Sequence, residues 1–201
     1  MTKKLWYQFW RPLVFTSGYL LVFSVYYIFK GDAEFIWYVA VTVLFFALIL
    51  GTIKYTRLSH WSIWGLSLWG LLHMAGGSVL VAGDVLYAYR LLPLVDRGGE
   101  FFILKFDQVV HAFGFAVATL VMYEITKRYF TGSRGLLVFI AALGGLGLGA
   151  INELVEFAAV VFMPSTGVGG YFNTGLDLVF NAVGAIFMAV MLYWKPRLKF
   201  K

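Results

Sequence analysis

Six apolar stretches, separated by short polar or charged segments, run along the chain. Each is close to the roughly 20 residues that a helix needs to cross the hydrocarbon core of a bilayer. We therefore predict an all-α fold, a polytopic membrane protein with six transmembrane helices. The predicted spans are residues 12–29, 35–53, 61–83, 101–126, 135–163 and 173–194.

The longest segment outside these spans is 84–100, which is too short for a soluble domain. Its tyrosines and Pro93 favour an interfacial helix, followed by a turn at residues 96–99. No small-x-small cleavage pattern follows the first span, so we expect this span to be retained rather than removed as a signal peptide. Residues 1–201 are thus predicted to form a single transmembrane domain.

Composition agrees with this interpretation, since the chain is 61% hydrophobic and only 13% charged. Soluble domains carry about 25% charged residues. The chain has no cysteine, which excludes disulfides and thiolate metal sites. Several tryptophans stand near the ends of the apolar stretches, as in the aromatic belt of membrane proteins. These are Trp6, Trp10, Trp37, Trp61 and Trp194.

The positive charges predict an orientation. If the N-terminus lies inside, twelve of the sixteen Lys and Arg residues fall on the cytoplasmic side. The positive-inside rule then predicts a multi-pass protein of the cell (inner) membrane with both termini in the cytoplasm. The net charge of +6 comes from short clusters between apolar stretches, so it does not indicate a nucleic-acid partner. We expect membrane lipids to be the partners instead. The sequence does not predict an oligomeric state.

Ionisable residues inside four spans are the most informative feature. Such residues are costly in a bilayer and usually face the interior of the bundle. The predicted topology brings them to one layer, in the half of the membrane away from the termini. We infer that helices within 61–194 build a polar core, with two peripheral helices over 12–53. Glu124, outside this layer, is predicted to form a surface ion pair with Lys127 and Arg128.

Two imidazoles and four carboxylates in one layer are enough for a divalent metal site. Imidazole with carboxylate suits Zn²⁺, Fe²⁺ or Mn²⁺. The predicted metal ligands are His73, His111, Asp107, Glu153, Glu156 and Asp177. Catalytic acid–base roles are predicted for Glu153, Glu156, Asp107 and Asp177, because burial can tune carboxylates for proton transfer. Asn152 and Asn181 lie one helical turn from Glu156 and Asp177, so we expect them to support these ligands.

Several short motifs in this region resemble a known family. They are Leu72-His73-Met74-x-Gly76-Gly77, Phe106-Asp107-x-x-x-His111, Glu153-x-x-Glu156-Phe157 and Asn173-Thr174-x-x-Asp177-x-x-x-Asn181. In this order they resemble YjdF-like inner-membrane proteins and, more distantly, VanZ-like membrane proteins. Asn173 departs from this resemblance, since the YjdF-like proteins tend to carry Asp there. The resemblance covers residues 72–186 and implies a membrane location and an important polar layer, but no reaction.

Three classes of function remain open from the sequence. The first is a membrane-embedded enzyme acting on a lipid or isoprenoid substrate, with or without a metal. The second is a proton-coupled transporter or small-solute permease, because intramembrane Asp, Glu and His form proton relays. The third is a non-catalytic protein, in which the polar groups only hold helices in register or bind a partner, a lipid or a drug.

Overall fold

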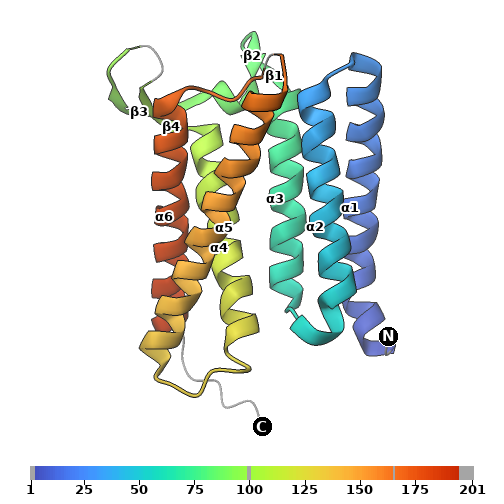
Figure 1. Ribbon diagram of the computed structural model, residues 1–201, viewed down its shortest axis with the longest axis vertical. Coiled ribbons are helices and arrows are strands. Elements are labelled where there is room, and N and C mark those ends of the chain that lie inside the picture. Colours follow the sequence, from blue (N-terminus) through green and yellow to red (C-terminus); the bar gives the residue numbers. More distant parts are fainter. Residues whose placement is uncertain (1–2, 99–100, 165, 195–201) are drawn as a thin grey trace.

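The computed structural model describes residues 3–98, 101–164 and 166–194. Within these residues the protein is mostly helical, and six helices run alternately up and down one bundle (Figure 1). All of them except α3 are long and apolar enough to cross a membrane. The helices are α1 (Lys3–Lys30), α2 (Ala33–Thr56), α3 (His60–Ser78), α4 (Phe106–Thr126), α5 (Arg134–Phe162) and α6 (Tyr171–Trp194).

Helix α3 occupies the middle of the bundle, between the pair α1 and α2 and the group α4 to α6 (Figure 1). Its sequence holds Ser62, Ser67, His73 and four glycines, and it lacks the long apolar stretch that each of the other five helices contains. Ser62 and Ser67 are buried, and Ser67 bonds Thr16 of α1 with 2.5 Å between the hydroxyl oxygens. The polar content of α3 therefore fits a helix that is surrounded by protein.

Helix α3 ends earlier than predicted, at Ser78 rather than at residue 83. Strands β1 (Leu80–Val81) and β2 (Asp84–Val85) follow it and pair antiparallel. The turn between them uses Ala82 and Gly83, both with positive φ. A left-handed backbone at two successive residues cannot continue a helix, which explains the early end.

The predicted interfacial helix over 84–100 is wrong, except for one 3₁₀ turn, η1 (Leu86–Ala88). Strand β3 (Arg90–Asp96) pairs with β4 (Phe102–Lys105) instead. Pro93 lacks the N–H that a helix interior needs, which helps to explain the difference. The predicted turn at 96–99 is partly seen, since the N–H of Gly98 donates to Asp96 Oδ1 at 2.9 Å and Gly98 has a φ of +79°. Its last residue lies outside the described residues.

The fourth predicted span began at residue 101, but α4 begins at Phe106. Gln108 accounts for the difference. Its side-chain oxygen accepts the N–H groups of Leu104 and Lys105 at 2.7 and 3.1 Å, and its amide nitrogen donates to the carbonyl of Phe102 at 3.0 Å. This buried amide satisfies the backbone of a strand, so residues 102–105 need no helical partners.

Glu124 is not the surface group that the sequence predicted, because its side chain is buried. Its carboxylate accepts the N–H of Ser59 at 2.8 Å and the hydroxyl of Ser62 at 2.7 Å. It therefore binds the first turn of α3, where unpaired N–H groups and the helix dipole favour an anion. Arg128 donates to the backbone oxygen of Glu124 at 3.2 Å.

Candidate functional site

The polar residues of α4, α5 and α6 lie close together near the start of α4 and of α6. Figure 1 shows that this end of the bundle carries the strands. Small residues allow these helices to approach closely. A Cβ on Gly184 would lie 1.9 Å from the carbonyl oxygen of Ala112, so α6 packs directly on the backbone of α4. A Cβ on Gly149 would lie 3.1 Å from the amide of Asn181, which places Asn181 against α5.

His111 and Asn181 form the centre of this cluster. Both are buried, and His111 Nδ1 lies 3.0 Å from Asn181 Oδ1. The amide nitrogen of Asn181 donates to Glu153 Oε1 at 3.2 Å. Since Asn181 uses its nitrogen for Glu153, its oxygen must accept from His111 Nδ1–H. In a neutral imidazole the lone pair then belongs to Nε2.

Nε2 of His111 lies beside a carboxylate of its own helix α4, and a carboxylate of α6 lies near the same imidazole. Nε2 lies 3.5 Å from Asp107 Oδ1, and Asp177 offers a carboxylate oxygen within 4.8 Å of both groups. Asn173 donates to Asp177 Oδ2 at 2.6 Å and lies 3.5 Å from Asp107 Oδ2. Asp177 is 1% exposed, yet its Oδ1 has no hydrogen-bond partner among the described residues. Such an unpaired buried oxygen is unusual in a folded protein and requires an explanation.

A second group of titratable atoms lies on the other side of the same imidazole. His111, Glu153 and Glu156 offer atoms within 4.8 Å of one another. Glu156 Oε1 accepts from Asn152 at 2.9 Å, and the buried Glu153 Oε2 has no partner in the described part of the chain. Here, however, His111 Nδ1 already donates to Asn181, so this side offers no imidazole lone pair. The group of Asp107, His111 and Asp177 is the better metal site.

The structure does not bring His73 into either group within the described residues. Its imidazole lies among the rings of Tyr38, Trp69 and Tyr87, with centroid distances of 5.7, 6.2 and 5.6 Å. The hydroxyl of Tyr87 donates to the carbonyl oxygen of His73 at 2.8 Å. Burial raises the pKa of Tyr87 well above its usual value, and the nearby Asp107 adds to the effect. Tyr87 therefore stays protonated and can keep this bond.

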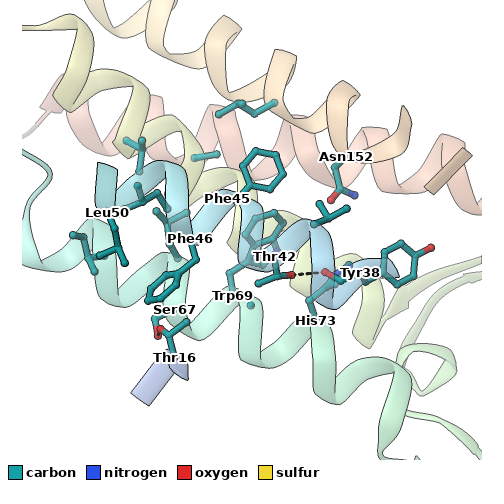
Figure 2. A pocket seen from close by; sticks show the side chains of 18 of the residues that line it. Thr16, Tyr38, Thr42, Phe45, Phe46, Leu50, Ser67, Trp69, His73 and Asn152 are labelled. Carbon is teal, nitrogen blue, oxygen red and sulfur yellow. Dashed lines mark hydrogen bonds between the residues drawn. The ribbon is translucent and has the colours of Figure 1, made fainter. Parts of the chain in front are cut away.

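Two cavities meet at this layer. The first, which we call the apolar cavity, has a volume of about 290 Å³ and lies among α1, α2, α3, α4 and α5 (Figure 2). The second, the polar cavity, has about 230 Å³ and lies beside the strands and the α5–α6 connection. Tyr38, His73 and Glu156 line both of them. Asp107 and Asn173 line only the polar cavity.

Several residues of this region were missed or undervalued by sequence reasoning. Asn173 was singled out only as a departure from the expected Asp, although its i,i+4 spacing to Asp177 signals a contact. Lys105 and Glu34 line the polar cavity, and Glu34 also accepts the N–H of Gly167 at 2.6 Å. Nothing in the sequence indicates that Glu34 of α2 approaches the connection between α5 and α6, because the two are far apart in the chain.

Fold and site together define a multi-pass α-helical membrane protein with a buried His–carboxylate cluster beside two cavities. The chain belongs to the family described as "Predicted membrane protein (DUF2238)", whose profile matches residues 12–197. This confirms the YjdF-like resemblance, whereas the VanZ-like resemblance stays a prediction.

One relative is an uncharacterized protein of Thermotoga maritima, 32% identical over 107 residues. The match covers 47% of this chain and 55% of the relative, so the chain spans about half the length of that protein. No solved structure matches.

Proposed function

We propose that this protein is a divalent-metal-dependent membrane enzyme that hydrolyses an ester of a lipid or isoprenoid. The observation that carries the proposal is the orphaned oxygen of the buried Asp177, next to the imidazole of His111 and the carboxylate of Asp107. Without a cation, two carboxylates at this distance repel each other, and burial increases the cost. A divalent cation removes both penalties.

One imidazole and two carboxylates suit Zn²⁺, Fe²⁺ or Mn²⁺. Three protein ligands leave coordination positions open, which is typical of catalytic rather than structural sites. Asn181 holds the His111 ring by accepting from Nδ1–H, and Asn173 holds Asp177. Such supporting hydrogen bonds fix the orientation of metal ligands.

Glu156 is our candidate for the general acid–base. It belongs to the second group around His111 and lines both cavities, so a substrate in either cavity reaches it. A bound metal would polarise the ester oxygen and lower the pKa of water. Glu156 would take the proton of the attacking water while the water oxygen bonds to the carbonyl carbon or phosphorus. It would return the proton to the leaving oxygen as that bond breaks.

Metal content tests the metal part of this proposal. Detergent-purified wild type, supplied with Zn²⁺, Mn²⁺ or Fe²⁺ and then dialysed, is expected to hold near-stoichiometric metal by inductively coupled plasma mass spectrometry. His111→Ala and Asp177→Asn should lose it, whereas Glu156→Gln and the control His60→Ala should keep it. Wild-type protein that holds no more metal than His111→Ala would overturn the proposal.

Activity tests the remaining part. Protein in vesicles made from a bacterial lipid extract should convert one lipid into products that mass spectrometry detects. The conversion should stop with a chelator and in Glu156→Gln, although Glu156→Gln keeps its metal. If Glu156→Gln converts the lipid at the wild-type rate, its acid–base role is refuted. If the metal-loaded wild type leaves every lipid of the extract unchanged, the enzyme proposal fails for membrane lipids.

We further infer that the strand-bearing end of the bundle, and with it the polar cavity, faces away from the cytoplasm. The support is the charge distribution, since eight of the twelve Lys and Arg residues in the described part of the chain belong to the segments at the opposite end. In this orientation both termini lie in the cytoplasm of a cell (inner) membrane protein. A substrate would then be taken from the outer leaflet or the outer aqueous side.

A further inference from the structure

The apolar cavity is long. Along α2 it is lined from Tyr38 to Ile53, a distance of roughly 22 Å at the helical rise. Its volume is about 290 Å³, and an apolar cavity of about 150 Å³ is already large enough to bind benzene. A volume of this size over this length has room for one extended hydrocarbon chain and too little room for two chains side by side.

The lining of this cavity is apolar over most of its length. Phe45, Phe46 and Leu50 of α2 extend along it, and Trp69 of α3 faces them (Figure 2). The hydroxyl of Thr42 donates a hydrogen bond to the carbonyl oxygen of Tyr38 at 2.8 Å, so this donor is already used within α2 (Figure 2). Such a surface favours a hydrocarbon ligand over a polar one.

The cavity also reaches the surface of the bundle. Phe45 and Leu50 of α2 and Ile151 of α5 line it, and these side chains remain 44%, 42% and 46% exposed. Helix α2 packs mainly on α1 and α3 and α5 mainly on α4 and α6, while Ala159 of α5 joins the cluster of Tyr38 and Val39 nearer the strand-bearing end. The opening therefore lies between α2 and α5, along apolar helices that a bilayer would surround. Hydrocarbon chains of lipids are the molecules that meet such an opening.

The other end of the cavity is chemically different. Here Tyr38, His73 and Glu156 form the boundary with the polar cavity. A molecule with one hydrocarbon chain and one polar head matches this pair of compartments, with its head–chain junction beside Glu156. Asp107 and Lys105 line the far compartment, where the head would lie.

We propose that the apolar cavity binds the single hydrocarbon chain of a lipid that enters between α2 and α5. This inference rests on the proposed function, whose substrate it defines as a single-chain lipid rather than a two-chain phospholipid. The chain can be a straight acyl chain or an isoprenyl chain, since both are narrow and apolar. The polar cavity receives the head, so that the bond to be cleaved lies next to Glu156.

Photolabelling tests the binding site directly. Protein in vesicles of diacyl phosphatidylcholine is given a diazirine-bearing hexadecanol, irradiated and mapped by mass spectrometry. Labels should concentrate on Thr42, Phe45 and Ile49, which line the cavity, rather than on the lipid-facing Leu44 and Leu48. Monoacylglycerol or farnesol should compete with the label, and the better competitor identifies an acyl or an isoprenyl chain. Equal labelling of both faces, or no competition, would overturn the proposal.

A pair of neighbouring variants provides the control. Thr42→Trp places an indole inside the cavity and should reduce labelling of the lining positions roughly tenfold or more. Val43→Trp, on the lipid-facing side of α2, should leave labelling unchanged. Both variants should unfold at temperatures close to that of the wild type. A well-folded Thr42→Trp that is labelled like the wild type would contradict the proposal.

Metal content separates this inference from the proposed function. Thr42→Trp should keep the metal, because Thr42 is not among the cluster residues. Specific labelling of a protein that binds no metal would preserve the chain site and refute the metal enzyme. A metal-loaded wild type without specific labelling would refute the chain site alone.

Discussion

Asn181 connects three helices through one side chain. It lies on α6, accepts from His111 of α4 and donates to Glu153 of α5. Its two contacts decide which nitrogen of His111 is available to a metal, although Asn181 itself is not among the candidate ligands. At the scale of one residue, the Asn181 amide therefore acts by holding the His111 ring in one orientation.

We predict that Asn181→Leu weakens metal binding by roughly 10- to 100-fold, because the ring loses its orienting acceptor. Competition with a chromophoric chelator, at fixed pH, measures the change in affinity. Asn152→Leu is the matched control, since Asn152 bonds the carboxylates of Glu156 and Glu153, and no hydrogen bond joins it to His111 among the described residues. Equal affinities for wild type and Asn181→Leu would show that Asn181 does not position a metal ligand.

A second residue-scale prediction concerns the contact between α4 and α6. Gly184→Ala should lower the free energy of unfolding by about 1–3 kcal/mol, because its Cβ would overlap a backbone oxygen that cannot move aside. Gly175→Ala on the same helix is the control, since a Cβ there meets nothing within 4 Å. The control should be neutral or more stable by up to about 1 kcal/mol. Thermal unfolding in detergent ranks the three proteins.

At the scale of elements, the sequence predicted all six helices but misplaced the ends next to the site. Hydropathy does not distinguish a short strand from an added helical turn. For this reason helix was predicted both for the apolar residues that follow α3 and for those that precede α4. The decisive interactions, such as Gln108 with the carbonyl of Phe102, are tertiary. Consequently Asp107 lies in the first turn of α4, closer to the helix end than a span that begins at residue 101 would place it.

The cluster of α4, α5 and α6 was easier to predict than the cavities. The i,i+4 spacing of Asp107 and His111, and of Asp177 and Asn181, already placed these pairs on single helix faces. The cavities depend on the relative positions of α2, α3 and α5. No local sequence pattern determines these positions. No pattern in the sequence indicated that His73 would lie among aromatic rings. Nor did any pattern indicate that His73 would lie outside the two groups of titratable residues around His111.

Glu124 yields a prediction about the docking of α3 on α4. Glu124→Ala would leave the N–H of Ser59 and the hydroxyl of Ser62 without their charged acceptor. We expect a loss of about 2–3 kcal/mol of stability, since hydrogen bonds to charged groups contribute about 1.5–3 kcal/mol each and partly re-form with water. Glu124→Gln should cost less, because its amide oxygen can still accept. Metal content should be unchanged in both variants, and a loss of metal would contradict this purely structural role.

At the scale of the whole molecule, the bundle has two chemically different ends. One end carries the strands and the polar cavity, and the other carries the α2–α3 and α4–α5 connections (Figure 1). For the proposed function, the end of the bundle that faces the cytoplasm decides which leaflet would supply the substrate. The charge bias predicts that the strand-bearing end faces outward.

The absence of cysteine from the chain makes this orientation directly testable. Single cysteines are introduced at Ser133, before α5, and at Arg97, near the end of the β3–β4 hairpin. A membrane-impermeant maleimide should label Arg97→Cys in intact spheroplasts, and Ser133→Cys only after the membrane is opened. Labelling with the reverse pattern would place the polar cavity on the cytoplasmic side. The proposed lipid substrate would then come from the inner leaflet, while the proposals of a metal site and of a chain-binding cavity would be unaffected.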